Sequence, residues 1–443
     1  MKNQKKILLA AYLLNPGQRN YDVLKLDFKK LQKELKSTGL IELFEKVEVP
    51  LVSVLADMEK IGIKIDVKHL EKMSGEFEKD LKKLTKQIHK LAGEEFNIKS
   101  PLQLKKILFE KLAISARGVR KTFKTGALST SARELVKLQG IHPIIKLIIK
   151  YRELQKLKST YIDALPKLVD SKTGRVHTNF NQTVTATGRL SSSSPNLQNI
   201  PIRSEYGKEI RKAFVADRGK VFLAFDYSQI ELRIVAHMAD DKKMIEAFNA
   251  GADIHTRTAA EVWKVEPEKV TKNMRRAAKA INFGITYGMG ARALAEAGGM
   301  SVQEAHEFIG RYFSLHQGIK NYIDETKALA RSMGYVETMF GRRRYLLGIT
   351  SMIPPERASA ERMATNHPIQ GTAADIIKMA MIKIHKDVKH PMLLQVHDEL
   401  VFEVTKKDIK NATKQIKEIM ENVVKLKVPI LVDVSEGKNW GEV

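Results

Sequence analysis

Cysteine is absent from the 443-residue chain, which excludes disulfide bonds and cysteine-ligated metal sites. A chain without cysteine is compatible with a reducing compartment. Long apolar runs are also missing, and none approaches the roughly 20 residues that a membrane span needs. Repeats and low-complexity tracts are absent from the printed sequence. The hydrophobic fraction of 43% is enough to bury a core, and the length suggests about two to four domains or subdomains.

Acidic residues are few relative to basic ones. Aspartate and glutamate total 51 and lysine and arginine total 76, so the formal net charge is +25. This excess favours a polyanionic partner, nucleic acid before an anionic membrane. A lysine-rich surface can also reflect a source genome or a hot habitat, and this alternative stays open at this point.

The chain changes character along its length. Its opening stretch, MKNQKKILLAAYLL, is basic and then apolar without a cleavage site, which predicts an amphipathic helix. Lysine-rich helical patterns follow over residues 50–162, and the turn-rich stretch RGVRKTFKTGALSTSARE interrupts them. Cations on paired helices and their tip suit contact with a nucleic-acid backbone. The segment Val176 to Arg203 predicts strands and loops that present hydrogen-bonding groups, and helices dominate from about 240 to 345.

The stretch VFLAFDYSQIELRIVAHM, Val221 to Met238, combines an apolar run with an acid. VFLAF is typical of a buried strand, and Asp226 lies at its end. The spacing of Ser228 and Glu231 is that of a capping box, which predicts that a helix starts there. A carboxylate beside a buried strand is costly unless a positive group meets it. Taken alone, Asp226 is better explained by turn or cap chemistry than by a catalytic role.

A second acidic stretch, MLLQVHDELVFEV, has two apolar halves around a polar tip. This pattern predicts a β-hairpin with His397, Asp398 and Glu399 at or near its turn. An ordinary acidic turn is the alternative. Two carboxylates on one sheet, however, suit hard divalent cations, and two metals roughly 3.5–4 Å apart are the arrangement used for phosphoryl transfer. The positive partner of Asp226 would then be Mg²⁺.

A third stretch, KNMRRAAKAINFGITYGMG, places Arg275, Lys279, Phe283 and Tyr287 four residues apart. On a helix these side chains form a stripe that spans roughly 120° over roughly 18 Å. Its cationic end can meet phosphates, and its aromatic end can meet a base. A solvated basic turn with two core aromatics is the alternative.

These stretches resemble a known family. DYSQIELR, RRAAKAINFGITYG and LLQVHDELVFE, in this order, are similar to the three polymerase motifs of family A DNA polymerases, the bacterial DNA polymerase I type. TATGRLSSSSPNLQNIP, GYVETMFGRRRY and ERMATNHPIQGTAAD also resemble that family. The likeness extends from about residue 45 to the C-terminus.

The resemblance implies an α+β right-hand polymerase fold, with an antiparallel palm sheet and helical fingers and thumb. It also implies how the chain is divided. The expected parts are a segment before the polymerase region (1–45), the start of the palm and the thumb (46–162), the palm with the first aspartate (163–238), the fingers with the nucleotide-binding helix (239–345) and the palm with the second aspartate (346–443).

The implied activity is template-directed, DNA-dependent DNA synthesis at a primer 3′-hydroxyl, with release of pyrophosphate. By resemblance, Asp226 and Asp398 hold two Mg²⁺ ions, for which Mn²⁺ can substitute, and the Tyr227 carbonyl is a backbone ligand. Lys279 is the acid that protonates pyrophosphate. Glu399 lies near the metals as a secondary acid.

The resemblance also assigns the deoxynucleotide site. Glu231 and Tyr287 form the gate that excludes a 2′-hydroxyl, and Phe283 stands where an aromatic ring disfavours chain-terminating nucleotides. Four side chains are implied to bind the triphosphate: Gln229, His255, Arg275 and Lys279.

Primer–template DNA is the implied macromolecular partner. Arg189, Gln370 and His397 match positions that read minor-groove acceptors, which all correct base pairs share, so these contacts check shape and not sequence. The other implied DNA-binding residues are Asn196, Asn199, Arg362 and Lys158.

Several expectations complete this hypothesis. About 45 residues precede the polymerase region, so we expect neither a 3′→5′ nor a 5′→3′ nuclease, and both a natural short form and a piece of a longer protein stay open. The protein is expected to be monomeric, cytoplasmic and nucleoid-associated, without a membrane partner. Reverse transcription is an open side activity.

Three other functions compete with this hypothesis. A single-chain RNA polymerase is opposed by the large gate residue Glu231. In a metal-dependent nuclease the phosphate-binding pair Arg275 and Lys279 would have no purpose. A non-catalytic DNA clamp is opposed by the presence of both acids, Asp226 and Asp398.

Overall fold

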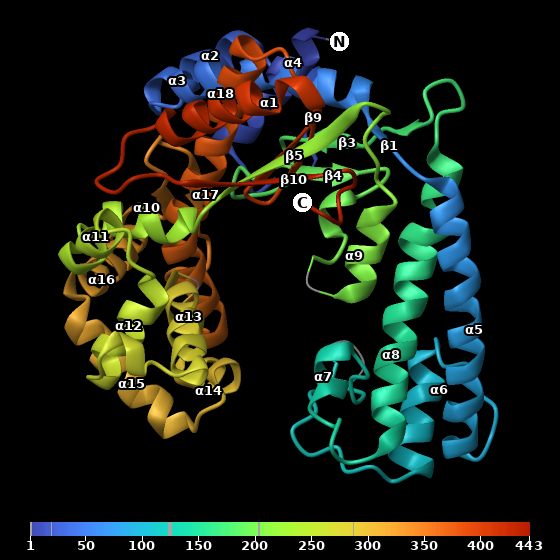
Figure 1. Ribbon diagram of the computed structural model, residues 1–443. Coiled ribbons are helices and arrows are strands. Elements are labelled where there is room, and N and C mark those ends of the chain that lie inside the picture. The colour runs from blue at the N-terminus through green and yellow to red at the C-terminus, as the bar shows by residue number, and fades with distance from the viewer. Residues whose placement is uncertain (1, 19, 123–125, 203, 287) are drawn as a thin grey trace.

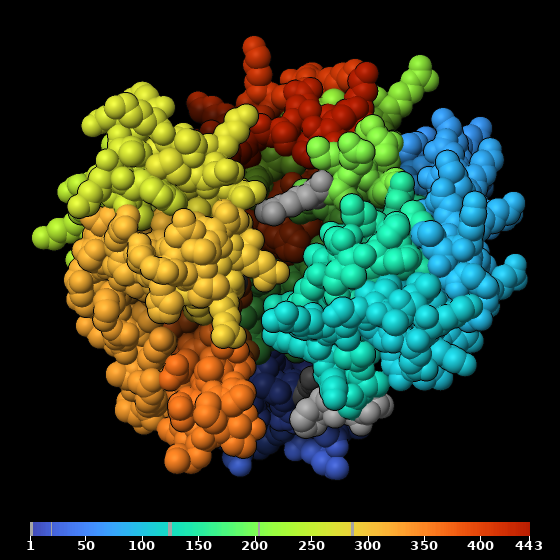
Figure 2. Space-filling model, turned by 90° about the horizontal axis from the view of Figure 1, so that it is seen from below, coloured from blue at the N-terminus to red at the C-terminus, as the bar shows by residue number. Residues whose placement is uncertain are grey.

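The computed structural model describes residues 2–18, 20–122, 126–202, 204–286 and 288–443. Two helical arms extend in the same direction from a base that contains the main β-sheet (Figure 1). The first arm comprises residues 67–162 and the second arm residues 230–333. Figure 2, which looks along the arms, shows that the surface is hollowed between them.

The main sheet has four antiparallel strands in the order β10-β5-β9-β8. Its strands are β5 (Lys220–Tyr227), β8 (Met392–Val396), β9 (Glu399–Thr405) and β10 (Val432–Gly437). Strand β5 is buried from Val221 to Phe225, because β9 and β10 flank it and helix α18 (Ile409–Asn422) packs on the sheet. Such a strand needs an uninterrupted apolar run, which VFLAF supplies. Three two-stranded sheets join β1 (Ile63–Lys64) to β2 (Arg175–Val176), β3 (Asn179–Asn181) to β4 (Ser191–Ser193), and β6 (Tyr335–Glu337) to β7 (Arg343–Tyr345).

The first arm is built on two long helices that pack together, α5 (Val67–Ala92) and α8 (Pro143–Leu157). Helix α5 buries Leu70, Met73, Phe77, Leu81, Leu84 and Ile88. This three- and four-residue spacing places one apolar stripe against α8 and leaves the lysines outside. The far end of the arm carries α6 (Pro101–Lys105) and α7 (Ala132–Val136).

The second arm is a cluster of shorter helices. Helix α13 (Lys272–Thr286) contacts its neighbours α12 and α14 in sequence order. The helices at the two ends of the arm, α10 (Ile230–Met238) and α16 (Gln317–Met333), contact the long helix α17 (Pro354–Asp387) of the base. The helices of this arm are α10 (Ile230–Met238), α11 (Lys242–Asn249), α12 (Ile254–Trp263), α13 (Lys272–Thr286), α14 (Ala291–Gly298), α15 (Val302–Leu315) and α16 (Gln317–Met333).

The N-terminal segment lies on the side of the base away from the arms, at the top of Figure 1. Leu9 to Leu13 of α1 (Lys2–Leu14) form a small core with α2 (Phe28–Ser37) and α3 (Ile41–Leu43), and Met379 and Ile382 of α17 close this core. The remaining α-helices of the described residues are α4 (Val49–Ile61) and α9 (Glu205–Lys212). No described helix is long and apolar enough to cross a membrane.

The expected strand at 221–225, the hairpin around residue 397 and the helix through Arg275 are all present. The predicted capping box is wrong. Strand pairing continues past Tyr227, since the Ser228 N–H donates to the Leu431 carbonyl at 2.9 Å. Gln229 then turns the chain at φ 54°, so helix α10 begins at Ile230 without a side-chain cap. The Glu231 carboxylate instead meets Arg189.

Candidate active site

Neighbouring strands bring the two predicted acids together at the base of the arms. Asp226 on β5 lies in register with Glu399 on β9 and with Asp433 on β10. Asp398 occupies the turn between β8 and β9, and its carbonyl accepts the Tyr227 N–H at 3.2 Å. Antiparallel pairing therefore joins acids that are far apart in sequence.

These acids form a repulsive cluster. Partial burial, together with Asp398, Glu399 and Asp433, raises the pKa of Asp226 to about 7. Burial also raises the pKa of Asp398, against the lowering effect of Arg189 and His397. Burial raises the pKa of Glu399 as well, although the Trp440 indole donates to its carboxylate at 3.2 Å. Within the part of the chain that the structure describes, neither Asp226 nor Asp398 forms a salt bridge. The negative charge of the cluster is therefore not neutralised by an ion pair, which favours the binding of a cation.

The donor set fits a divalent cation that is shared with a substrate. No group of three His, Cys, Asp or Glu side chains able to hold a metal occurs among the described residues. Mg²⁺ does not require such a cage, because it keeps several waters and binds one or two carboxylates plus substrate phosphates. Asp226 and Asp398 are donors of this kind, and a cation between them would relieve their mutual repulsion.

Helix α13 presents the predicted cationic stripe, with Arg275 and Lys279 exposed and Phe283 half-buried. Tyr287 lies outside the described residues. The Arg275 Nε atom donates to Asp253 at 2.8 Å, and Asp253 also caps α12.

His255 lies against this helix. It is only 2% exposed, its Nδ1 atom is 3.1 Å from the Asn282 amide, and its ring centroid is 5.6 Å from that of Phe283. Burial lowers the pKa of His255 to about 4, and the charges of Arg275 and Lys279 act in the same direction. The imidazole is therefore neutral at pH 7, and the structure brings it together with both cations.

Glu231 and Arg189 form an ion pair between α10 and the loop that follows β3, with an N–O distance of 2.7 Å. The Glu231 side chain is only 7% exposed, so this carboxylate is fixed in place. Gln229 precedes it in the left-handed region, and its Oε1 atom is buried without a hydrogen-bond partner among the described residues. Gln370 on α17 is mostly buried, whereas His397 is exposed, and partial burial lowers its pKa.

The other predicted DNA-binding residues lie in different settings. Asn196 accepts a hydrogen bond from the Ser192 hydroxyl at 3.0 Å, and Asn199 and Arg362 are exposed. Lys158 is held within the first arm, where it pairs with Asp163 at 2.9 Å and with Glu78 at 3.6 Å. Its side chain is only 13% exposed, so most of its hydrogen-bonding capacity is used internally.

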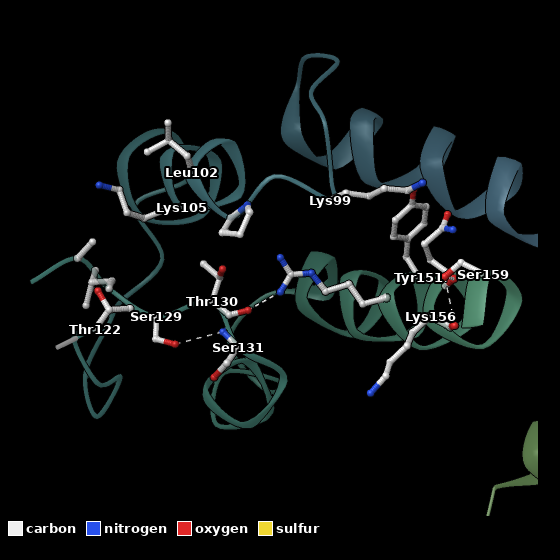
Figure 3. Close-up of a pocket in the computed structure, with 15 residues that line it drawn as sticks. Lys99, Leu102, Lys105, Thr122, Ser129, Thr130, Ser131, Tyr151, Lys156 and Ser159 are labelled. Atoms are coloured by element: carbon white, nitrogen blue, oxygen red, sulfur yellow. Dashed lines mark hydrogen bonds between the residues drawn. The ribbon is translucent and has the colours of Figure 1, made fainter. Parts of the chain in front are cut away.

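A basic pocket of about 780 Å³ lies in the first arm (Figure 3). Arg152 of α8 lines this pocket, its guanidinium donates to the Thr130 carbonyl, and burial lowers the pKa of Arg152. No acid occurs among its described lining residues. Those that carry polar side chains are Lys99, Lys105, Thr122, Ser129, Thr130, Ser131, Tyr151, Arg152, Gln155, Lys156 and Ser159. Our sequence interpretation expected a cationic surface here but did not name these residues; the four-residue spacing of Arg152 and Lys156 on one helix was the available signal.

The chain is similar over most of its length to known proteins. Residues 67–442 match the sequence model of DNA polymerase family A. The chain is 50% identical over 409 residues to the thermostable DNA polymerase I of Thermus filiformis, covering 92% of this chain and 49% of that protein. It is 49% identical over 416 residues to the DNA polymerase I of Geobacillus stearothermophilus, covering 93% and 47%. The chain thus spans about half the length of the curated relatives it matches.

The fold has a solved counterpart. The POL domain of Pol1 from M. smegmatis, in complex with DNA primer-template and dNTP, matches with a TM-score of 0.92 at 38% identity, covering 98% of this chain and 82% of that chain. The predicted α+β right-hand polymerase fold is confirmed by this match. The matched family model spans most of the sequence, and the chain belongs to DNA polymerase family A.

Proposed function

We propose that this chain is a template-directed, DNA-dependent DNA polymerase that adds deoxynucleotides to a primer 3′-hydroxyl and releases pyrophosphate. The observation that carries the proposal is the position of Asp226 at the end of β5 beside Asp398 in the β8–β9 turn, at the base of the two arms. The basic helix α13 in the second arm and the basic pocket in the first arm support it. The solved relative was captured with DNA primer-template and dNTP, which are the partners proposed here.

In this proposal the sheet-containing base is the palm, the first arm the thumb and the second arm the fingers. The proposed boundaries are those expected from the sequence: 1–45, 46–162, 163–238, 239–345 and 346–443. The protein would act as a monomer, since both acids and the cationic stripe come from a single chain.

Asp226 and Asp398 would hold two Mg²⁺ ions, with the Tyr227 carbonyl as a further ligand. When bound, the ions supply Lewis-acid activation of the primer hydroxyl and neutralise triphosphate charge. The raised pKa of Asp226 supports this role, because it reflects burial and repulsion by neighbouring acids. A bound cation would offset this repulsion. Glu399 stays secondary, since its carboxylate is engaged by Trp440.

The remaining side chains would bind and orient the nucleotide. Arg275, Lys279, Gln229 and His255 would contact the triphosphate, with His255 neutral. Lys279 would also deliver a proton to the leaving pyrophosphate. Phe283 would pack on the incoming nucleotide, and Glu231 with Tyr287 would exclude a 2′-hydroxyl.

Primer–template DNA would lie in the hollow between the arms. Arg189, Gln370 and His397 would read minor-groove acceptors of the terminal base pairs. Asn196, Asn199 and Arg362 would contact the strands nearby. Arg152 and Lys156 would meet backbone phosphates, and Lys158 would support that surface from within the first arm.

The test is primer extension on a labelled hairpin DNA with Mg²⁺ and the four deoxynucleotides, with the wild type beside Asp398→Ala. Template-length product from the wild type alone supports the proposal. If neither protein extends the primer while both bind the hairpin, the chain is a non-catalytic clamp. Equal use of ribonucleotides by the wild type would favour an RNA polymerase.

A further inference from the structure

The loop that carries Arg189 is held from beneath by distant parts of the chain. We call residues 182–189, which follow β3, the arginine loop. At its start, the Gln182 amide donates to the Glu48 carboxylate at 2.8 Å. In its middle, the Tyr12 hydroxyl of helix α1 donates to the Thr185 carbonyl at 2.7 Å. The Thr185 hydroxyl in turn donates to the carbonyl of Arg189 at 2.6 Å.

The end of the arginine loop rests on a buried guanidinium. Gly188 has φ 83°, and a Cβ atom at this position would overlap the Arg342 side chain. Only glycine allows both this backbone conformation and this approach. The backbone next to Arg189 is therefore seated directly on Arg342.

Arg342 belongs to a charge cluster of Glu48, Arg342, Asp375 and Lys378, each no more than 1% exposed. Arg342 pairs with Glu48 and with Asp375, and the Lys378 ammonium donates to Glu48 at 2.7 Å. Burial opposes ionisation of Glu48, but Lys378 and Arg342 lower its pKa to about 2, so the Glu48 carboxylate is ionised at neutral pH. Removing one partner of such a buried pair leaves the other charge buried without a counterion and strongly destabilises the fold, so the four side chains hold one another in place.

We infer that Tyr12 and Thr185 are positioning residues for Arg189, and that the charge cluster is the fixed platform on which they act. This inference rests on the proposed minor-groove role of Arg189. The ion pair to Glu231 orients the guanidinium at the tip of the side chain, whereas Tyr12, Thr185 and Arg342 fix the backbone at its root. Reading a terminal base pair requires both ends to be fixed, because a displacement of about 1 Å can cost a large part of the rate.

The inference also gives the N-terminal helix a part in polymerisation. Tyr12 is fully buried, and burial raises the pKa of its hydroxyl, so the group is a permanent donor. Its hydrogen bond reaches the arginine loop and not a neighbour within α1. Helix α1 would thus act on the primer terminus through one hydroxyl group.

The experiment uses Tyr12→Phe and Thr185→Val, each of which removes one hydroxyl group. Single-nucleotide extension is measured on a normal primer and on a primer whose terminal purine carries carbon in place of the minor-groove N3 acceptor. Both variants are also made in an Arg189→Ala background. The matched control is Tyr21→Phe, because the Tyr21 hydroxyl bonds to Asn15 within the N-terminal segment.

We expect Tyr12→Phe and Thr185→Val to lower kcat about 2- to 10-fold on the normal primer, with a smaller change in the KM for dNTP. The loss should vanish on the altered primer and in the Arg189→Ala background, while Tyr21→Phe behaves as the wild type. A loss that persists in both settings, or no loss at all, overturns the inference.

The design separates this inference from the proposed function. If Arg189→Ala and the altered primer slow the wild type while Tyr12→Phe does not, only the positioning role fails. If neither Arg189→Ala nor the altered primer has an effect, Arg189 does not read the minor groove. The proposed minor-groove role of Arg189 and the positioning role of Tyr12 and Thr185 are then both refuted. Thermal unfolding of each variant identifies any loss that comes from misfolding.

Discussion

At the scale of single residues, the neighbouring acids of the candidate active site lower the stability of the folded protein. Asp226 stands beside three other acids on or next to paired strands, and its pKa is raised to about 7. Asp217, close to the start of the same strand, has the opposite environment. There Lys64, Arg175 and Lys220 hold the pKa below its usual range in spite of partial burial. Two aspartates near the two ends of β5 therefore contribute to stability with opposite sign.

This contrast predicts that Asp226→Asn stabilises the protein when no metal is bound. The native protein keeps the Asp226 proton between about pH 4 and pH 7, where the unfolded chain has lost it, so the wild type loses stability as pH rises through that window. The advantage of the variant should grow from pH 5 to pH 8. Because the site is open to solvent, we expect a gain on the order of 1 kcal/mol at most. Thermal unfolding in EDTA measures it.

Asp217→Asn is the matched control, because its sign is reversed. The lowered pKa of Asp217 adds stability above the unfolded value and loses it only as pH falls. This variant should therefore be less stable than the wild type at pH 8. Destabilisation by both substitutions would contradict the electrostatic account of Asp226.

At the scale of elements, helix α13 divides its cations between two tasks. Arg275 and Lys279 are exposed on the proposed nucleotide face, whereas Arg276 turns away and donates to the Gly298 carbonyl of α14 at 3.2 Å. The side chain of Arg275 is further fixed by Asp253, which caps α12. One helix thus packs with its neighbour on one side and presents charge on another.

We predict that Arg275→Ala and Lys279→Ala each reduce kcat/KM for dNTP addition by about 10- to 100-fold, the range for losing a charge-assisted hydrogen bond. Arg275→Ala should act mainly on KM, since it removes ground-state contact with the triphosphate. Lys279→Ala should lower kcat as well, because it also removes the proposed proton donor. Steady-state kinetics with single-nucleotide addition would measure both effects.

Arg276→Ala supplies the control, since it removes the same charge one residue away. It should lower thermal stability slightly and leave the KM for dNTP near the wild-type value. Equal defects in all three variants would mean that α13 acts through its overall charge and has no specific nucleotide face.

At the scale of the whole molecule, the net charge of +25 is consistent with a polyanionic partner in the hollow between the arms. The basic pocket places Arg152 and Lys156 in one arm, while α13 lies in the other. Cations in both arms allow contact with one DNA molecule over several phosphates. Each neutralised phosphate releases counterions, so the affinity must depend steeply on salt.

Arg152→Ala and Lys156→Ala should each weaken DNA binding and reduce the slope of log K against log salt by about 1. Lys414→Ala on α18 is the control, because this exposed lysine lies on the base at a distance from both arms. Its substitution lowers the net charge equally and should leave the slope unchanged. Titrations of a fluorescent hairpin at several salt concentrations would decide whether position or total charge matters.

The elements around the site could be predicted wherever their signal was local. The apolar run before Asp226, the paired halves around Asp398 and the four-residue stripe of α13 are short patterns, and each element formed as expected. The predicted capping box does not form because Ser228 and Glu231 contact distant parts of the sequence. The Ser228 N–H pairs with the Leu431 carbonyl, which extends the strand pairing, and the Glu231 carboxylate pairs with Arg189. Local propensity is overridden when tertiary contacts of this kind compete with it.

The charge cluster shows what such patterns cannot reveal. Glu48 lies 294 residues before Arg342 and 330 residues before Lys378, and none of the three stands in a stretch that predicts burial. Charged residues are ordinarily assigned to the surface, so their pairing emerges only in the folded chain. The Tyr12 hydrogen bond to Thr185 was hidden for the same reason.

The position of strand β10 has a consequence for synthesis of the protein. β10 (Val432–Gly437) pairs directly with β5. The strand that bears Asp226 therefore lies between β9 and β10, which are both synthesised after it. During translation the helices of both arms can fold as they leave the ribosome. The sheet cannot close until residues 432–437 have emerged. A nascent chain that stops short of them leaves one side of β5 unpaired, so it would offer a basic surface to nucleic acid before it could elongate a primer.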